Sequence, residues 1–272
     1  MLEYLRPPSI AVVDLHGQIG PSIRPIDYAR LLIGLREDAS VRAVVLNIDS
    51  PGGSASGSEL LTRAVRRLRE EKPVIAFISG LGASGGYMVA MSAERVFALP
   101  SALVGSIGVI AYRPLVYEAL GRIGVRMNVA KSGRLKDMMS PFREATEEER
   151  QKEQALLDAM YDLFVQGVAS ERRVPVERVR ELATGEIYTA TDAREHGLID
   201  QLGDLDDAID WTATRAGLKR RVRIVRPRRS LRDMLIGRGS SAAFGGLGGL
   251  AGELGATTRG GIHYLYTGPG AP

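Results

Sequence analysis

Four apolar runs alternate with helical segments in the first hundred residues, and this alternation constrains the fold more than any other feature. The runs cover residues 9–15, 41–48, 74–78 and 95–99 and are rich in β-branched residues. Between them, apolar residues recur at intervals of three and four, which is typical of amphipathic helices. Continuous apolar strands that alternate with helices predict an α/β layer fold with a mainly parallel sheet and the helices outside it.

Helices are predicted at four places: 25–38, 58–71, 84–94 and 146–172. The last has the clearest start in the chain, because Thr146 followed by Glu149 forms the sequence of a capping box. We expect its apolar stripe to consist of Leu156, Met160, Leu163 and Phe164. Two further helices are expected within 177–200, on either side of a Tyr-Thr turn, and a late strand at 221–227.

The composition changes near residue 215, which predicts a main domain of residues 1–214 and an extension of residues 215–272. Ten Lys and Arg residues and one acid lie between Arg215 and Arg238, and twelve of the last 36 residues are glycine. A basic block of this kind is most often a solvated face, but it could contact an anionic membrane or a partner. It lacks the interleaved aromatic residues that would favour nucleic acid.

The residue inventory excludes several kinds of chemistry. The chain has no cysteine and only three histidines, so a cysteine nucleophile is excluded and a histidine-rich metal centre is not expected. No apolar run reaches the roughly 18 residues that cross a bilayer. The N-terminus does not have the layout of a signal peptide. We therefore expect a cytoplasmic or peripherally membrane-associated protein, or one whose anchor lies outside this sequence.

Glycine-rich turns follow the predicted strands, and two of them flank a serine. Gly52 and Gly53 end one strand, while Ser84 lies between the next strand and the helix that begins at Gly85. Ligands bind at the carboxyl ends of parallel strands, where two converging amide N–H groups can form an oxyanion hole. Ser84 has the position of a nucleophile at a helix N-terminus, but a serine there can equally be a helix cap.

A nucleophilic serine needs a base, and no histidine stands in a recognisable triad pattern. A lysine is the alternative, because burial can lower its pKa from the usual ~10.4 by several units. The segment "KSGRLKDMMSP" offers Lys131 and Lys136 beside apolar residues. For either lysine, a solvated surface position is the simpler interpretation, so the residues alone leave the base open.

Four stretches resemble the signal peptide peptidase A family, within the ClpP/crotonase superfamily. They occur in the family's order, cover roughly residues 8–205, and read "IDSPGGS", "SGLGASGGYMVAMSAERVFALPSALVGSIGVI", "KSGRLKDMMSPFREATEEER" and "GEIYTATDAREHGLIDQLG". The resemblance implies a ClpP/crotonase-like fold of repeated ββα units. The stomatin-associated proteases are close relatives, but their lysine follows the serine at a shorter interval. No lysine lies between Ser84 and Lys131 here.

The resemblance also implies the roles of individual residues. The family's serine nucleophile corresponds to Ser84 and its lysine base to Lys136. The oxyanion donors correspond to Gly53 and Gly85, and Ser106 is expected to orient the lysine. Neither a cofactor nor a metal is implied.

The implied activity is that of a serine endopeptidase with a Ser–Lys dyad that cleaves short apolar peptides such as signal-peptide remnants. The family forms rings or domes, so a homo-oligomer is expected. A crotonase-like acyl-CoA enzyme would share the fold without needing the dyad. A non-catalytic scaffold would instead use residues 215–272 to bind a membrane or a partner.

Overall fold

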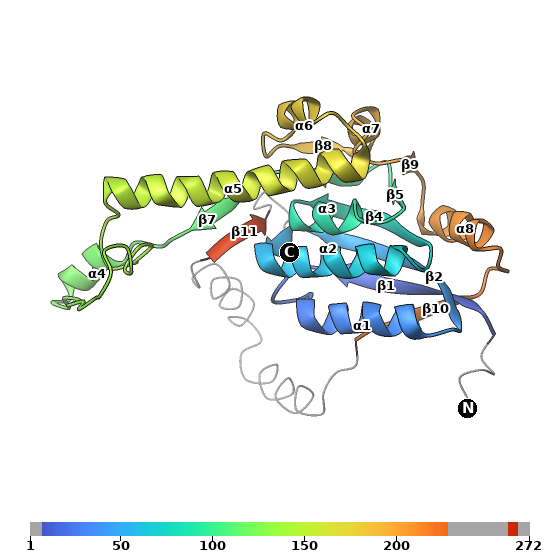
Figure 1. Ribbon diagram of the computed structural model, residues 1–272, viewed down its shortest axis with the longest axis horizontal. Coiled ribbons are helices and arrows are strands. Elements are labelled where there is room, and N and C mark those ends of the chain that lie inside the picture. Colours follow the sequence, from blue (N-terminus) through green and yellow to red (C-terminus); the bar gives the residue numbers. More distant parts are fainter. Residues whose placement is uncertain (1–6, 228–260, 266–272) are drawn as a thin grey trace. The chain divides into compact units, whose positions relative to one another are not determined.

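The computed structural model describes residues 7–227 and 261–265, shown as coloured ribbons in Figure 1. These residues divide into two compact units. The first unit comprises residues 7–109, 163–227 and 263–265; the second comprises residues 110–162 and 261–262. The boundary expected after residue 214 falls inside helix α8 (Leu205–Ala216), and strand β10 (Val222–Val225) of the expected extension belongs to the main sheet.

A mainly parallel eight-stranded sheet forms the first unit. Its principal path runs β10–β1–β2–β4–β5–β9, with β6 beside β4 and β8 beside β6. Only the β6–β8 pair is antiparallel among these described pairings. The remaining strands of this sheet are β1 (Ser9–His16), β2 (Val41–Ser50), β4 (Val74–Ala83), β5 (Arg95–Ala98), β6 (Leu103–Gly105), β8 (Ile187–Thr189) and β9 (Gln201–Leu202). The expected α/β class with a mainly parallel sheet is confirmed.

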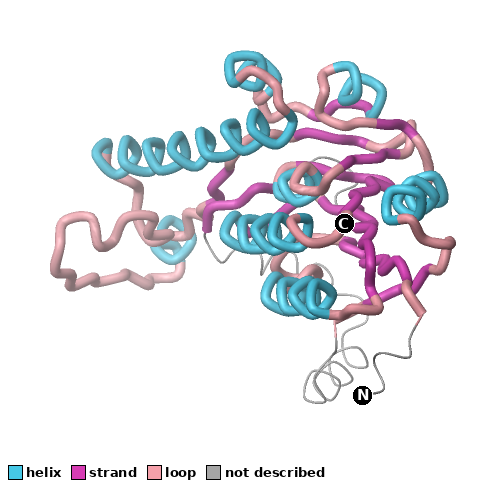
Figure 2. Tube along the Cα trace, turned by 45° about the vertical axis from the view of Figure 1, so that its right-hand side comes forward, coloured by secondary structure: helices cyan, strands magenta, loops and turns pink. Residues whose placement is uncertain are grey.

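Helices lie on both sides of this sheet, as the tube in Figure 2 shows. Their bounds are α1 (Pro25–Glu37), α2 (Ala55–Arg69), α3 (Gly85–Ala90), α6 (Val176–Leu182) and α7 (Ala190–Glu195), together with α8. The expected Tyr-Thr turn is wrong, because those residues form strand β8. Tyr188 pairs with Val104 of β6, so a long-range partner overrides the local turn signal.

Helix α8 covers one face of the sheet. Ile209 and Ala213 form a core cluster there with Val12, Val45 and Phe97 from three strands of the sheet. A capping box starts α8, since the side chains of Asp204 and Asp207 each accept a 2.9 Å bond from the other's backbone N–H. The helix ends at Gly217, whose φ of 63° is the left-handed conformation that glycine adopts readily.

Helix α5 (Glu147–Arg172) begins in the second unit and ends in the first. The expected capping box is confirmed: the Thr146 N–H donates to Glu149 Oε2 at 2.9 Å, and the Glu149 N–H donates to Thr146 Oγ1 at 3.3 Å. The expected apolar stripe is only partly buried. Phe164 is fully buried, but Leu163 is 67% exposed and Leu156 is 36% exposed.

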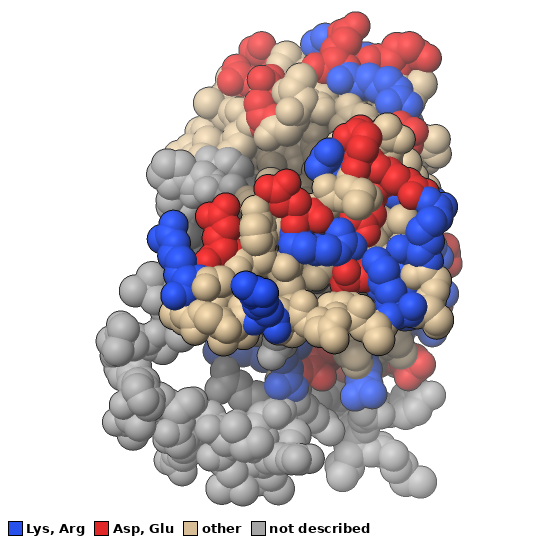
Figure 3. Space-filling view, turned by 90° about the vertical axis from the view of Figure 1, so that its left-hand side faces the viewer, with Lys and Arg blue, Asp and Glu red and all other residues tan. Residues whose placement is uncertain are grey.

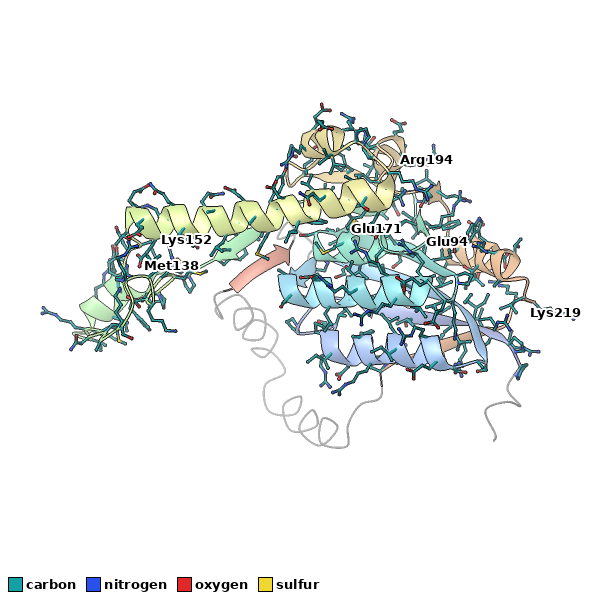
Figure 4. The ribbon with its side chains drawn as sticks, in the orientation of Figure 1. Glu94, Met138, Lys152, Glu171, Arg194 and Lys219 are labelled. Carbon is teal, nitrogen blue, oxygen red and sulfur yellow. The ribbon has the colours of Figure 1, made fainter. Side chains whose placement is uncertain are left out.

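The C-terminal end of α5 is held on α2 by ion pairs within the first unit. Glu171, labelled in Figure 4, accepts from Arg66 Nε at 2.7 Å and from Arg69 Nη1 at 2.7 Å. The second unit also contains β7 (Ile110–Tyr112) and α4 (Tyr117–Arg122). Among its described residues 110–162, Glu149 alone is buried.

A separate short strand, β3 (Gly52–Ser54), directly follows β2 and pairs antiparallel with β11 (Gly261–Leu265). Tyr264 is the register partner of Gly53. The rest of the glycine-rich extension lies outside the described residues. Across the described ranges 7–227 and 261–265, none of the helices combines the length and apolarity that a membrane crossing requires.

Candidate active site

Ser84 lies at the tip of α3, immediately after β4. Its φ of 51° and ψ of −117° are unusual for a residue with a side chain, and such backbone strain concentrates at functional sites. The side chain is buried and makes no capping hydrogen bond to α3 in the described structure. Ser84 therefore occupies the N-cap position without serving as the helix cap that the sequence left possible.

The surroundings of Ser84 hold it rigidly. Every residue of α3 is buried, and the Tyr87 hydroxyl donates to the Leu198 carbonyl oxygen at 2.8 Å. Burial raises the pKa of Tyr87 well above its usual value, so this hydroxyl keeps its proton. Thr62 of α2 donates to the Met88 carbonyl oxygen at 3.2 Å. The short helix is thus anchored by side-chain bonds at two successive residues.

Ser106 lies beside Ser84 because β4 and β6 are adjacent parallel strands. Ala83 and Gly105 are register partners, and each serine is the next residue along its strand. The Ser84 N–H donates to the Gly105 carbonyl oxygen at 2.7 Å. Ser106 is also buried and has a positive φ of 49°, and its N–H donates to the Glu186 carbonyl oxygen at 2.7 Å. Ser84 and Ser106 are therefore two buried serines with strained backbones that directly follow the neighbouring strands β4 and β6.

The two glycine turns also meet. Ser50 of β2 is the register partner of Gly82 of β4. A Cβ added to Gly86 would lie 2.6 Å from the Ser50 carbonyl oxygen, so only glycine permits this approach of α3 to the end of β2. The turn that contains Gly53 and the turn that contains Gly85 therefore belong to one neighbourhood, as their places after parallel strands predict.

Asp49 is a residue that the sequence reasoning missed. Its Oδ1 accepts from the Leu81 N–H at 2.9 Å, where the register between β2 and β4 shifts. A Cβ on Gly80 would lie 2.8 Å from the same oxygen. Asp49 thus stabilises the irregular stretch of β4 that leads to Ser84. Its place in the "IDSPGG" motif was the available signal, but a strand-end acid has no distinctive spacing.

Gly53 is locked against the backbone of Ile19. The Ser54 N–H donates to the Ile19 carbonyl oxygen at 2.9 Å, and the Ile19 N–H donates to the Gly52 carbonyl oxygen at 2.7 Å. The φ of Gly53 is +148°, and an added Cβ would lie 2.1 Å from the Ile19 oxygen. A side chain at position 53 therefore requires the backbone itself to move.

We predict that Gly53→Ala destabilises the protein by about 2 kcal/mol or more, because the new methyl group meets a backbone atom. Urea unfolding measures the change. Gly34→Ala in α1 is the matched control: nothing lies within 4 Å of its added Cβ, so it should be neutral or stabilising by up to about 1 kcal/mol. Equal urea midpoints for Gly53→Ala and the wild type would contradict this assignment.

Lys136 lies in the second unit, whereas Ser84, Ser106, Gly53 and Gly85 lie in the first. It is exposed, and its N–H donates to the Gly133 carbonyl oxygen at 3.1 Å, which closes a turn. Lys131 is also exposed, but its Nζ lies 3.8 Å from Asp137 Oδ2. Within the described structure, only Lys131 of the two candidate bases is engaged in an ion pair.

Metal ligation finds no support among the residues that the structure describes. No group of three or more His, Asp or Glu side chains is gathered there as a metal site would require. His196 forms the C-cap of α7, and its ring meets the Tyr188 ring edge-on at 5.2 Å. His16 ends β1 and is exposed, and the side chain of His263 lies outside the described structure.

The family model and two similar curated proteins point to the same family. Residues 66–219 match the family model described as peptidase family S49. The chain is 37% identical over 213 residues to the chloroplastic serine protease SPPA of Arabidopsis thaliana, covering 76% of this chain and 32% of that protein. It is 37% identical over 177 residues to the putative signal peptide peptidase SppA of Enterococcus faecium, covering 65% and 52%. The chain therefore spans about half or less of the length of these two relatives.

The fold has a counterpart among solved structures. A ClpP1 mutant from Listeria monocytogenes superimposes with a TM-score of 0.51 at 16% identity, covering 76% of this chain and 96% of that one. At this identity, the likeness concerns the fold alone. It confirms the expected ClpP-like architecture.

Proposed function

The chain belongs to peptidase family S49, the family of signal peptide peptidase A, and we propose that it is an endopeptidase whose catalytic dyad is Ser84 and Lys136. The observation that carries the proposal is the geometry of Ser84. It is strained, buried, free of any capping role, and placed between a strand end and a helix N-terminus. At this position the positive end of the helix dipole stabilises negative charge near a serine nucleophile.

The proposed reaction proceeds in two steps. In the first, the neutral amine of Lys136 takes the hydroxyl proton as Ser84 Oγ attacks the peptide carbonyl carbon. The amide N–H groups of Gly53 and Gly85 then donate to the oxyanion. The C–N bond breaks, and the protonated lysine returns its proton to the leaving amine. In the second step, Lys136 takes a proton from a water molecule as the water oxygen attacks the acyl carbon. The ester C–O bond breaks, and the protonated lysine returns this proton to Ser84 Oγ, which releases the carboxylic acid product and free Ser84.

Ser106 has a supporting role in this proposal. Its register position beside Ser84 suits a hydroxyl that accepts a hydrogen bond from the lysine amine and orients it. The φ of 49° and the hydrogen bond from the Ser106 N–H to the Glu186 carbonyl oxygen fix the backbone that carries this hydroxyl. The support is the position of Ser106 next to the proposed nucleophile.

The proposed substrates are short, extended, apolar peptides such as signal-peptide remnants. The test is the release of amines from an unstructured apolar peptide by the purified chain. Hydrolysis by the wild type that is lost in Ser84→Ala supports the proposal. Turnover of an acyl-CoA thioester to the same extent by both proteins, without peptide hydrolysis, would instead indicate a crotonase-type enzyme.

We propose that the substrate strand pairs with the edge of β3, next to Gly53. Backbone pairing of this kind holds extended peptides in many recognition sites. In the structure, β11 occupies that edge, with Tyr264 opposite Gly53. A substrate that uses the edge must therefore replace β11.

A chain that ends at Gly260 should have a lower KM for apolar peptides than the full chain, because it lacks the competing strand. The decrease is about tenfold if β11 is paired nine-tenths of the time. A chain that ends at Leu265 keeps β11 and is the matched control. Peptide hydrolysis over a range of substrate concentrations measures both. An unchanged KM in the shorter chain would show that substrates bind elsewhere.

The proposed assembly is a homo-oligomeric ring or dome. The second unit exposes several large apolar side chains, including Ile123 at 72% and Met127 at 50%. Leu163 on α5 is exposed at 67%. Exposed large apolar side chains in such numbers favour burial against another molecule, and a second copy is the proposed occupant. Sedimentation velocity should give a mass several times the 29.4 kDa of one chain.

Peripheral membrane contact through residues 215–272 is a further proposal. Arg215, Arg220 and Arg223 are already paired with Glu94, Asp206 and Asp38, respectively. These pairs neutralise much of the basic block within its described part, so anionic lipid would have to engage the remaining cations. Co-sedimentation with vesicles that contain anionic lipid tests this contact.

A further inference from the structure

Arg143 is the centre of a hydrogen-bonded cluster in the second unit, in the segment that follows Lys136. Figure 4 labels Met138 in this segment and Lys152 on the neighbouring helix α5. A guanidinium group has five N–H donors, and here all five have acceptors. The acceptors are the Glu149 carboxylate oxygens at 2.7 and 2.5 Å, Asp137 Oδ2 at 2.7 Å, the Asp137 carbonyl oxygen at 3.0 Å and the Glu144 carbonyl oxygen at 2.9 Å.

Glu149 is the fixed end of this cluster. It is only 2% exposed and also accepts from the Thr146 N–H in the capping box of α5. The two-pronged bond to Arg143 has the geometry in which guanidinium and carboxylate groups bind most strongly. The hydrogen bonds from Arg143 and Thr146 lower the pKa of Glu149 to about 2. Its carboxylate therefore remains charged at any pH at which a peptidase would be assayed.

Asp137 is the other end, and it directly follows the proposed base. Arg143 binds both its carboxylate and its carbonyl oxygen, so the main chain on the C-terminal side of Lys136 is fixed. The turn bond from the Lys136 N–H to Gly133 fixes the N-terminal side. Hydrogen bonding by Arg143 also holds the pKa of Asp137 below its usual value. The Asp137 carboxylate therefore stays charged and is bound by Arg143.

Several other charged groups around this segment are also paired. Figure 3 shows basic and acidic side chains interspersed on one face of the molecule. Within the second unit, Arg134 pairs with Glu148, Lys131 lies near Asp137, Arg150 pairs with Glu147, Arg113 pairs with Glu153, and Tyr117 donates to Glu144. No acid within 4.0 Å of the Lys136 amine is recorded among the described residues of this unit.

We propose that Arg143 is a positioning residue for the general base: it fixes the main chain beside Lys136 and holds the Asp137 carboxylate away from the Lys136 amine. The inference rests on the proposed function, since it assigns Arg143 a role only if Lys136 is the base. A neighbouring carboxylate stabilises the ammonium form of a lysine. Because the reaction needs the neutral amine, an acid next to the base must be engaged elsewhere.

The pH dependence distinguishes this role from a purely structural one. When Arg143 is replaced, the Asp137 carboxylate becomes free to pair with the Lys136 ammonium. The base then loses its proton only at higher pH, so the rising limb of the rate–pH profile moves to higher pH. A residue that merely stabilised the fold would lower the rate at every pH without moving this limb.

The experiment compares rate–pH profiles of the full-length wild type, Arg143→Lys and Arg143→Gln with an apolar peptide substrate. Both variants should lower kcat by about ten- to a hundredfold, the range expected when a catalytic group is misplaced by about 1 Å. In Arg143→Gln the rising limb should also move up by about one pH unit or more. The double variant Arg143→Gln/Asp137→Asn should return the limb toward its wild-type position, because the competing carboxylate is gone.

Arg134→Gln is the matched control. Arg134 lies in the same segment and pairs with Glu148, but it is largely exposed, so its loss should leave the profile unchanged. Circular dichroism identifies any variant that fails to fold. In that case Glu149→Gln is measured instead, because it removes the carboxylate that binds Arg143 but keeps the size and shape of the side chain. If folded Arg143→Gln keeps the rising limb at the wild-type pH, the role of Arg143 is overturned while the proposed function stands. Absence of hydrolysis by the wild type at every pH would overturn the proposed function itself.

Discussion

Ser84→Ala is expected to reduce peptide hydrolysis by a factor of about 10³ or more. The substitution removes the one oxygen that would attack the peptide carbonyl and keeps the Cβ, so the strained backbone at position 84 is unchanged. The measurement is kcat/KM for an apolar peptide with a fluorescent leaving group. Ser92→Ala is the matched control, because Ser92 is also buried near α3 but its hydroxyl donates to the Val89 carbonyl oxygen at 2.6 Å.

The strain at Ser84 gives this prediction a second component. At φ 51° and ψ −117°, glycine has no Cβ to collide with the backbone, whereas alanine keeps the collision. Ser84→Gly should therefore be as inactive as Ser84→Ala but more stable to urea by about 1 kcal/mol. A folded Ser84→Ala enzyme that keeps more than a small fraction of wild-type activity would exclude Ser84 as the nucleophile.

Lys136→Met is expected to cause the second large loss, also by a factor of about 10³. The substitution keeps an unbranched side chain of similar length but removes the amine that accepts the Ser84 proton. Lys131→Met is the matched control, because it changes the same residue type in the same "KSGRLKD" segment. Lys131 lies 3.8 Å from Asp137, and the loss of this half-exposed ion pair should change the rate little.

The pH profile separates the roles of the two lysines. The neutral amine is the reactive form, so wild-type activity should rise as the pH increases through the titration of the base. Lys131→Met should keep this rise, and the residual activity of Lys136→Met should lack it. If Lys131→Met abolishes activity while Lys136→Met retains it, the assignment of the base from the family motif is reversed.

Local patterns predict much of this fold. The apolar runs at 41–48 and 74–78 are strands buried on both faces, and such strands carry apolar side chains at successive positions. The Thr146–Glu149 capping box forms because both partners lie within one helical turn. The meeting of the two glycine turns follows from a general property of parallel sheets, whose strand ends face the same edge.

Features set by long-range contacts are those that the sequence did not predict. Tyr188 lies in a strand only because β6 offers it a partner. Leu156 and Leu163 have helical spacing, but spacing alone does not say whether another element covers that face of α5. Helix α8 was not predicted, although Asp204 and Asp207 form a capping box at its start.

The candidate site also combines positions that local motifs predict with features that depend on long-range contacts. The positions of Ser84 and Gly53 follow from motifs near strand ends. The strained φ of Ser84, the contact of Gly53 with Ile19, and the pairing of β3 with β11 depend on residues distant in the sequence. The five bonds of Arg143 come from acceptors six residues away on both sides as well as next to it, and no single-residue signal points to such a cluster.

The site at which a serine-reactive phosphonate attaches identifies the nucleophile most directly. The purified chain is treated with an apolar peptidyl phosphonate, digested, and analysed by mass spectrometry. We expect one adduct, on the peptide that contains Ser84, which is absent in Ser84→Ala and strongly reduced in Lys136→Met. An adduct on another serine that blocks hydrolysis, or full hydrolysis by protein already labelled at Ser84, would contradict it.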